Sequence, residues 1–124
     1  MRFKVVINTC YGGFDLSDDA LRMLAARRGL SLDETRDEYI YGGTCINGAR
    51  SCPALIATIE RLGEKESSGR HSELEIVELE DKNGLYSINE YDGWESVYTP
   101  DSHHWEVALN RVEVEPIRIE IGGE

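Results

Sequence analysis

The sequence has no apolar run near the roughly 18 residues that a membrane-spanning helix needs, so we expect no membrane segment. Its N-terminus also lacks an apolar segment followed by a small-residue cleavage site, the pattern of a secretory signal. Hydrophobic residues make up 40% of the 124 positions, which is typical of a folded chain and too high for a disordered one. We therefore predict a single cytoplasmic domain over residues 1–124.

Cysteine is scarce and widely spaced. Cys10, Cys45 and Cys52 are an odd number of thiols, and without an export signal we expect them to be free. Cys45 and Cys52 lie too far apart in sequence for a short structural zinc loop, and we predict no metal and no other cofactor. Cys10 lies between a strand-like run and a helical pattern, where a thiol can become nucleophilic. We interpret Cys10 as structural, and the reactive alternative stays open.

Basic residues are also few, because 13 Lys and Arg stand against 24 Asp and Glu, giving a net charge of −11. Over Ser72–Tyr98 the imbalance is strongest, with Lys82 as the one base among many acids. Such a field repels phosphates, so direct nucleic-acid binding is disfavoured. An acidic face that attracts a basic partner is one interpretation. The favoured one is a solvated sheet face that keeps the protein soluble.

The N-terminal segment predicts a strand, a glycine turn and a helix. Val5 to Ile7 are β-branched, Gly12 and Gly13 permit a tight turn, and Ser17 is a good helix N-cap. A glycine turn before a helix can bind phosphate through free backbone N–H groups. This loop has no GxGxxG or GKS/GKT pattern, and three aspartates already occupy the positive end of the helix dipole: Asp15, Asp18 and Asp19. We therefore expect a structural turn.

The rest of the pattern predicts a second helix and several strands. Residues 53–62 begin with proline, precede Gly63 and carry one apolar face. Residues 30–49 hold only a weak helical signal, so we predict a long loop or insertion there. Asn83-Gly84 is the strongest hairpin turn, and we expect the strands on either side of it to pair. Asp92-Gly93 is a second turn signal, and residues 106–124 are predicted to be a C-terminal strand extension.

These elements predict an α+β fold, a mostly antiparallel β-sheet with two helices packed on one face. The C-terminal segment alternates apolar and polar residues after Pro116. Such a strand completes a sheet edge or pairs across two copies of a chain. A homodimer formed through this strand is therefore a further hypothesis.

Several strings match a pattern found in other proteins: Val5 to Phe14, Leu16 to Ala20, Arg50 to Leu55, Leu62 to Glu64, Leu74 to Glu78, and Glu90 to Gly93 with Glu95. They resemble a family of small uncharacterised proteins common in tailed-phage and prophage genomes, and the match runs from the start to about Trp105. The chain departs from the family at Ser51 and Cys52, where acids are usual, and in its residues after Trp105. The resemblance carries no assigned chemistry and implies a phage accessory role in the host cytoplasm.

The candidate residues are interpreted as partner-binding or ligand-binding, and none as catalytic: Cys10, Tyr11, Gly12, Gly13, Phe14, Arg50, Tyr91, Asp92, Gly93, Glu95, His104 and Trp105. Arg50 could clamp a carboxylate or phosphate, or it could be a salt-bridge partner, which we favour. For Tyr91 to Gly93 we likewise favour a structural role, because this sequence is typical of a tight turn. His103 and His104 are adjacent, so on a strand they point to opposite faces and do not fit one site.

We predict a non-catalytic binding module that inhibits a host factor, such as an anti-phage defence protein, through its acidic face or the loop at 30–49. Two alternatives stay open. One is sequestration of a small nucleotide-like signalling molecule, which predicts a role for Arg50, Arg61 or Arg111. The other is a thiol-dependent or metal-dependent enzyme.

Overall fold

A computed structural model describes residues 1–41 and 48–100 of the chain. Its elements follow the order β1 (Arg2–Asn8), α1 (Asp18–Arg28), α2 (Leu32–Tyr39), the short 3₁₀ turn η2 (Ala49–Ser51), α3 (Pro53–Leu62), α4 (Glu64–Ser67), β2 (Leu74–Glu80), β3 (Ser87–Tyr91) and β4 (Trp94–Tyr98). The predicted α+β class is confirmed. None of the helices in these two described ranges has the length and apolar character to cross a membrane.

The strands form two antiparallel pairs, β1 with β2 and β3 with β4. The predicted hairpin across Asn83-Gly84 is therefore wrong, because β2 pairs with β1 and not with β3. Asp81 explains the difference: it is buried, and its carboxylate accepts the backbone N–H groups of Asn83 and Leu85, each at 2.9 Å. This closes a turn that sends the chain across to a second layer instead of back along β2.

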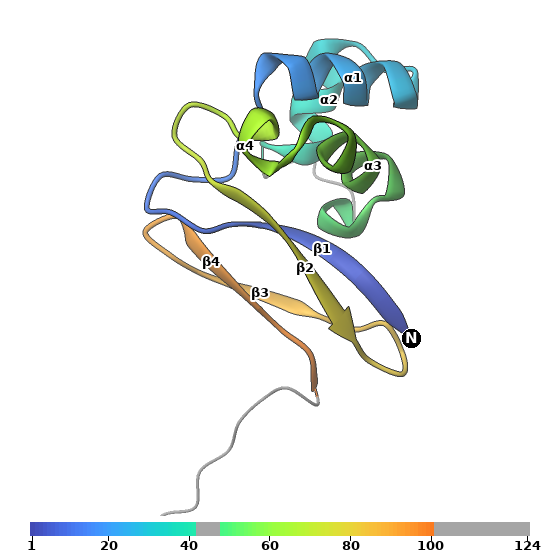
Figure 1. The fold of residues 1–124 in the computed structure, drawn as a ribbon, viewed down its shortest axis with the longest axis vertical. Coiled ribbons are helices and arrows are strands. Elements are labelled where there is room, and N and C mark those ends of the chain that lie inside the picture. The colour runs from blue at the N-terminus through green and yellow to red at the C-terminus, as the bar shows by residue number, and fades with distance from the viewer. Residues whose placement is uncertain (42–47, 101–124) are drawn as a thin grey trace, which may run out of the picture.

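The β1–β2 pair lies between the helices and the β3–β4 hairpin (Figure 1). Val6 belongs to the core under the helices, together with Leu24, Leu55 and Ile59. Val5 is fully buried but lies outside that cluster, and the alternation of side chains along a strand points it to the opposite face from Val6. The strand β1 is therefore buried on both faces at these two positions.

Local capping signals fix the helix ends. The Ser17 side chain caps α1 by accepting the N–H of Ala20, and Gly29 ends this helix in a left-handed conformation. The helix α3 begins with Pro53 at its first turn and ends at Leu62, as predicted.

The segment 30–49, predicted as a long loop or insertion, contains the helix α2. Ser31 and Glu34 form a capping box at its start, and the helix packs through the buried Thr35 and Tyr39. Only two residues of α2 are buried, so its sequence lacks the repeated apolar positions that would predict a helix. Residues 42–47 and the predicted strand extension at 106–124 lie outside the described residues, as do His103, His104 and Trp105.

Candidate functional site

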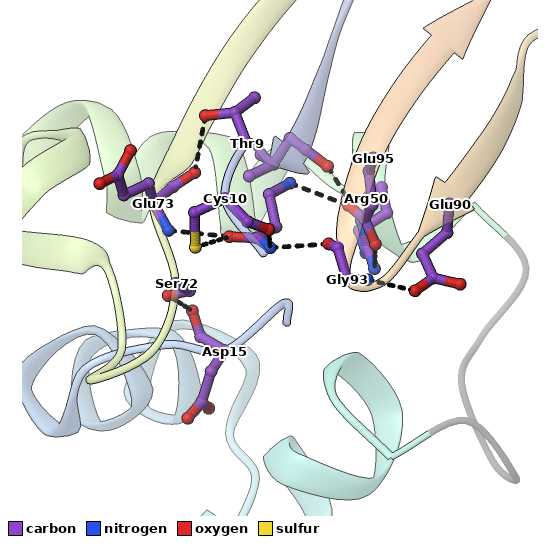
Figure 2. Close-up of polar contacts among 11 residues, drawn as sticks. Thr9, Cys10, Asp15, Arg50, Ser72, Glu73, Glu90, Gly93 and Glu95 are labelled. Atoms are coloured by element: carbon purple, nitrogen blue, oxygen red, sulfur yellow. Dashed lines mark hydrogen bonds and ion pairs between the residues drawn. The ribbon is translucent and has the colours of Figure 1, made fainter. Parts of the chain in front are cut away.

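Asn8, the last residue of β1, is fully buried and bonds the loop that follows it to two segments far along the chain. Its partners Cys10, Glu73 and Gly93 are labelled in Figure 2. Its Nδ2 donates to the backbone oxygens of Cys10 (2.9 Å) and Gly93 (2.8 Å), and its Oδ1 accepts the N–H of Glu73 (2.8 Å). These bonds hold together the loop between β1 and α1 (residues 9–17, which we call the glycine loop), the start of β2 and the β3–β4 turn. Sequence reasoning missed Asn8; the available signal was a polar residue ending a buried β-branched strand, where its polar groups must find partners.

Arg50 and Glu95 close the free edge of β1. Their side chains form a two-pronged ion pair, with Nη–Oε distances of 2.6 and 2.9 Å. Arg50 also donates to the backbone oxygen of Val6 (3.3 Å), while Glu95 accepts the N–H of Asn8 (2.8 Å). The pair thus satisfies edge groups that a neighbouring strand would bond. Arg50 is engaged as a salt-bridge partner in this way, and its guanidinium also stacks 3.6 Å from the Phe14 ring centroid.

Gly12 in the glycine loop and Gly93 in the β3–β4 turn approach other backbone atoms too closely to carry a side chain. A Cβ on Gly12 would lie 1.6 Å from the backbone oxygen of His71, and one on Gly93 would lie 2.3 Å from the Gly12 oxygen. Gly93 also has φ +89° and follows Asp92 at φ +51°, which is the backbone of a tight hairpin turn. Both glycines are therefore required by close approach.

Several backbone N–H groups of the loop are already bonded within the protein. Gly13 donates to the backbone oxygen of His71 (3.1 Å), Leu16 to the Asp15 carboxylate (2.8 Å) and Ser17 to the backbone oxygen of Ser67 (2.8 Å). A phosphate would have to displace these partners. This supports the structural turn that the sequence predicts.

Cys10 takes part in the same framework. Its Sγ lies 3.5 Å from Asn8 Oδ1 and 3.4 Å from the His71 backbone oxygen, and it accepts the N–H of Gly12 at 3.4 Å. These are the contacts of a structural cysteine that bridges two loops.

Three aromatic side chains gather on the surface of this framework, and we call them the aromatic patch: Tyr11, Tyr91 and Trp94. Tyr91 and Trp94 face each other across the β3–β4 ladder, and the Tyr11 ring meets Trp94 edge-on with centroids 4.9 Å apart. Their exposed fractions are 65%, 72% and 41%. Large aromatic residues exposed together on rigid supports are typical of protein-binding surfaces.

A second cluster, which sequence reasoning missed, surrounds Cys52. The Tyr39 hydroxyl lies 3.0 Å from Cys52 Sγ and accepts a hydrogen bond from Arg28. Burial raises the pKa of Tyr39 to about 12. Arg28 donates to the Tyr39 oxygen, and either the Tyr39 hydroxyl or the Cys52 thiol can donate in the contact between them. The available signal was the Cys-Pro pair at the start of a strong helical pattern.

The environment of Cys52 favours its charged form. Burial raises the pKa of the Cys52 thiol, but the Tyr39 hydrogen bond and the N–H groups of Leu55 and Ala54 at the start of α3 outweigh burial. The net effect is a lowered pKa.

The structure therefore brings most of the predicted residues together. The stretch from Cys10 to Phe14, Arg50, Tyr91 to Gly93 and Glu95 meet at one end of the molecule, while His104 and Trp105 lie outside the described residues. Within the described residues, no group of three or more His, Cys, Asp or Glu is placed to hold a metal ion.

No family model, curated protein or solved structure matches this chain at a significant level. The resemblance to phage and prophage proteins stays a prediction.

Proposed function

We propose that this protein is a non-catalytic binding module that docks on a partner protein through the aromatic patch. The observation that carries the proposal is the exposure of Tyr11, Tyr91 and Trp94 together on a tightly bonded support. Rigid Tyr and Trp side chains bury a large area on binding and lose little conformational entropy, so they dominate many protein interfaces.

The support restricts how the patch can move. Asn8 bonds the turn beside Trp94, Gly12 packs against His71 and Gly93, and Glu95 is fixed by Arg50. Each of these contacts joins segments far apart in sequence. The aromatic rings are therefore held in place before a partner arrives, which lowers the entropic cost of association.

The charge of the molecule indicates the kind of partner. Exposed acids flank the patch in the β3–β4 turn, at Glu90 and Asp92, and the whole chain carries −11. A basic protein surface would be attracted by this field, and an acidic one would be repelled.

In line with the resemblance, the proposed partner is a host factor in the bacterial cytoplasm, such as an anti-phage defence protein, which this module inhibits by occupying its basic surface. A small nucleotide-like ligand is less well supported, because the N–H groups of Gly13, Leu16 and Ser17 are bonded within the protein.

Site-specific crosslinking tests the proposal. A photoreactive phenylalanine analogue at position 94 is expected to capture one discrete protein in a host lysate, at a 1:1 ratio. The same analogue at Leu85, which is 54% exposed but lies outside the patch, is the matched control and should capture no discrete partner. Equal capture from both positions, or none from position 94, would contradict the proposal.

A further inference from the structure

Beside the aromatic patch lies a pocket of about 370 Å³, next to the glycine loop, α1 and the end of α2. Its lining includes several apolar side chains: Phe14, Leu16, Leu21 and Ile40. Gly12 also lines the pocket and adjoins Tyr11 of the patch in sequence. One residue of the pocket lining is therefore the chain neighbour of a residue of the aromatic patch.

Two carboxylates give this pocket its charge. Asp15 and Asp18 both line it, and neither forms an ion pair with any other described residue. Arg36 lines it too, and its ion pair with Asp33 is exposed and 3.6 Å long, so the ionised side chains of the lining carry a net charge of −1. His71 completes the polar lining. The carboxylates of Asp15 and Asp18 are thus left to attract a cation.

An anion fits the pocket less well. The N–H groups of Gly13 and Leu16 are bonded to the His71 backbone oxygen and to Asp15. Asp18 further occupies the first turn of α1, where the helix dipole would otherwise favour an anion. Apolar walls next to carboxylates that form no ion pair with a described residue suit a ligand with an aliphatic stem and a cationic head, which is the chemistry of lysine and arginine side chains.

We infer that this pocket binds a lysine or arginine side chain of the partner protein. The inference rests on the proposed function, because a partner docked on the aromatic patch would bring that side chain to the pocket. The net charge of −11 favours a basic partner in the same sense. The patch would supply apolar contact area, and the pocket would select for a basic residue beside it.

NMR titration of the full chain with acetyl-arginine methylamide tests the pocket. We expect saturable shifts at the amides of Leu16, Leu21 and Ile40, with half-saturation on the order of a few millimolar. The citrulline analogue has nearly the same shape without the charge, and it should bind several-fold more weakly. Equal binding of the two probes, or no saturable shift with arginine, would overturn the inference.

Substitutions distinguish arginine binding in the pocket from a general attraction by the net charge of the protein. Asp15→Asn with Asp18→Asn removes both carboxylates while keeping an oxygen acceptor for the Leu16 N–H, and it should weaken arginine binding about threefold or more. Asp19→Asn is the matched control, because Asp19 shares the first turn of α1 but pairs with Arg22 and does not line the pocket. Equal weakening by both variants would assign the effect to net charge and refute the pocket.

The two proposals can fail separately. Crosslinking from position 94 without a preference for arginine over citrulline would overturn the pocket alone. A preference for arginine without crosslinking would contradict the aromatic patch as the docking surface, and with it the partner protein as the source of the side chain.

Discussion

At the edge of β1 that does not face β2, side chains rather than a neighbouring strand bond the backbone groups. Arg50 and Glu95 bond Val6 and Asn8 of this strand, while Asn8 bonds the two turns that flank it. Each of these groups is buried or nearly so, which makes an unpaired partner costly. The ion pair is therefore a structural requirement of the surface that carries the aromatic patch.

Replacing Glu95 by alanine should lower the free energy of unfolding by about 3 kcal/mol, because it leaves the Arg50 charge and the Asn8 N–H without their partner. Glu78→Ala is the control, since its ion pair with Arg2 is exposed and 3.6 Å long, and it should change stability by about 0.5 kcal/mol or less. Urea unfolding followed by circular dichroism measures both. Similar losses in the two variants would contradict a special role for Glu95.

Cys52 should be alkylated faster than an ordinary thiol at neutral pH. Its lowered pKa means that the thiolate, which is the reacting form, persists to lower pH than usual. Tyr39→Phe removes the hydrogen bond that favours the thiolate, so the pH at which alkylation is half-maximal should move upward. Peptide mass spectrometry after iodoacetamide labelling gives the rate at each cysteine, with Cys10 as the internal reference. An unchanged profile at Cys52 would show that Tyr39 does not influence this thiol.

At the scale of elements, patterns that act over a few residues predicted the structure well. The buried strand β1, the capped helix α1, the Pro-to-Gly helix α3 and the Asp92-Gly93 turn all follow from neighbouring residues. Strand pairing does not, because a turn signal such as Asn83-Gly84 does not say which strands meet. The helix α2 gave only a weak signal in the sequence because its stability comes from a capping box and two buried residues rather than an apolar face.

The candidate site shows the same limit. Tyr11, Gly12, Gly13 and Phe14 were found because they form a recognisable loop, whereas their contacts with Gly93 and His71 cross most of the chain. Asn8 bonds partners 65 and 85 positions away, and no local pattern marks such a residue. These long-range contacts determine the structural role of each candidate residue, and no local sequence pattern predicts them.

The two glycines of the loop should differ sharply in their tolerance of alanine. Gly12→Ala places Cβ 1.6 Å from a backbone oxygen of His71, so the loop must shift, and we expect a loss of about 2–3 kcal/mol. Gly13→Ala meets no atom within 4 Å and should cost about 1 kcal/mol or less. Urea midpoints of the two variants test this difference directly. Equal midpoints would show that the close approach of Gly12 to His71 does not constrain the loop.

At the scale of the whole molecule, the layers determine what is presented to a partner. Helices cover one side of the β1–β2 pair and the β3–β4 hairpin lies on the other (Figure 1), so the hairpin turn meets the glycine loop at one end of the sheet. That end carries the aromatic patch and adjoins the pocket lined by Asp15 and Asp18. The charge of −11 surrounds this surface with a negative field.

The field predicts that partner association depends on salt. Raising the ionic strength from 0.05 to about 0.5 M should slow association several-fold, because screening shortens the reach of the acidic surface. Dissociation should change less, since the aromatic contacts do not depend on charge. Biosensor kinetics with the crosslinked partner, purified for the purpose, measure both rates. Association that does not respond to salt would contradict a basic partner.

The most direct test of the central claim is quantitative affinity capture from a bacterial host lysate by the wild-type protein and by its Trp94→Ala and Leu85→Ala variants. The account predicts one partner retained by the wild type and by Leu85→Ala, and reduced at least tenfold with Trp94→Ala, the effect of a central interface aromatic. A partner retained equally by all three proteins would show that binding does not pass through the aromatic patch.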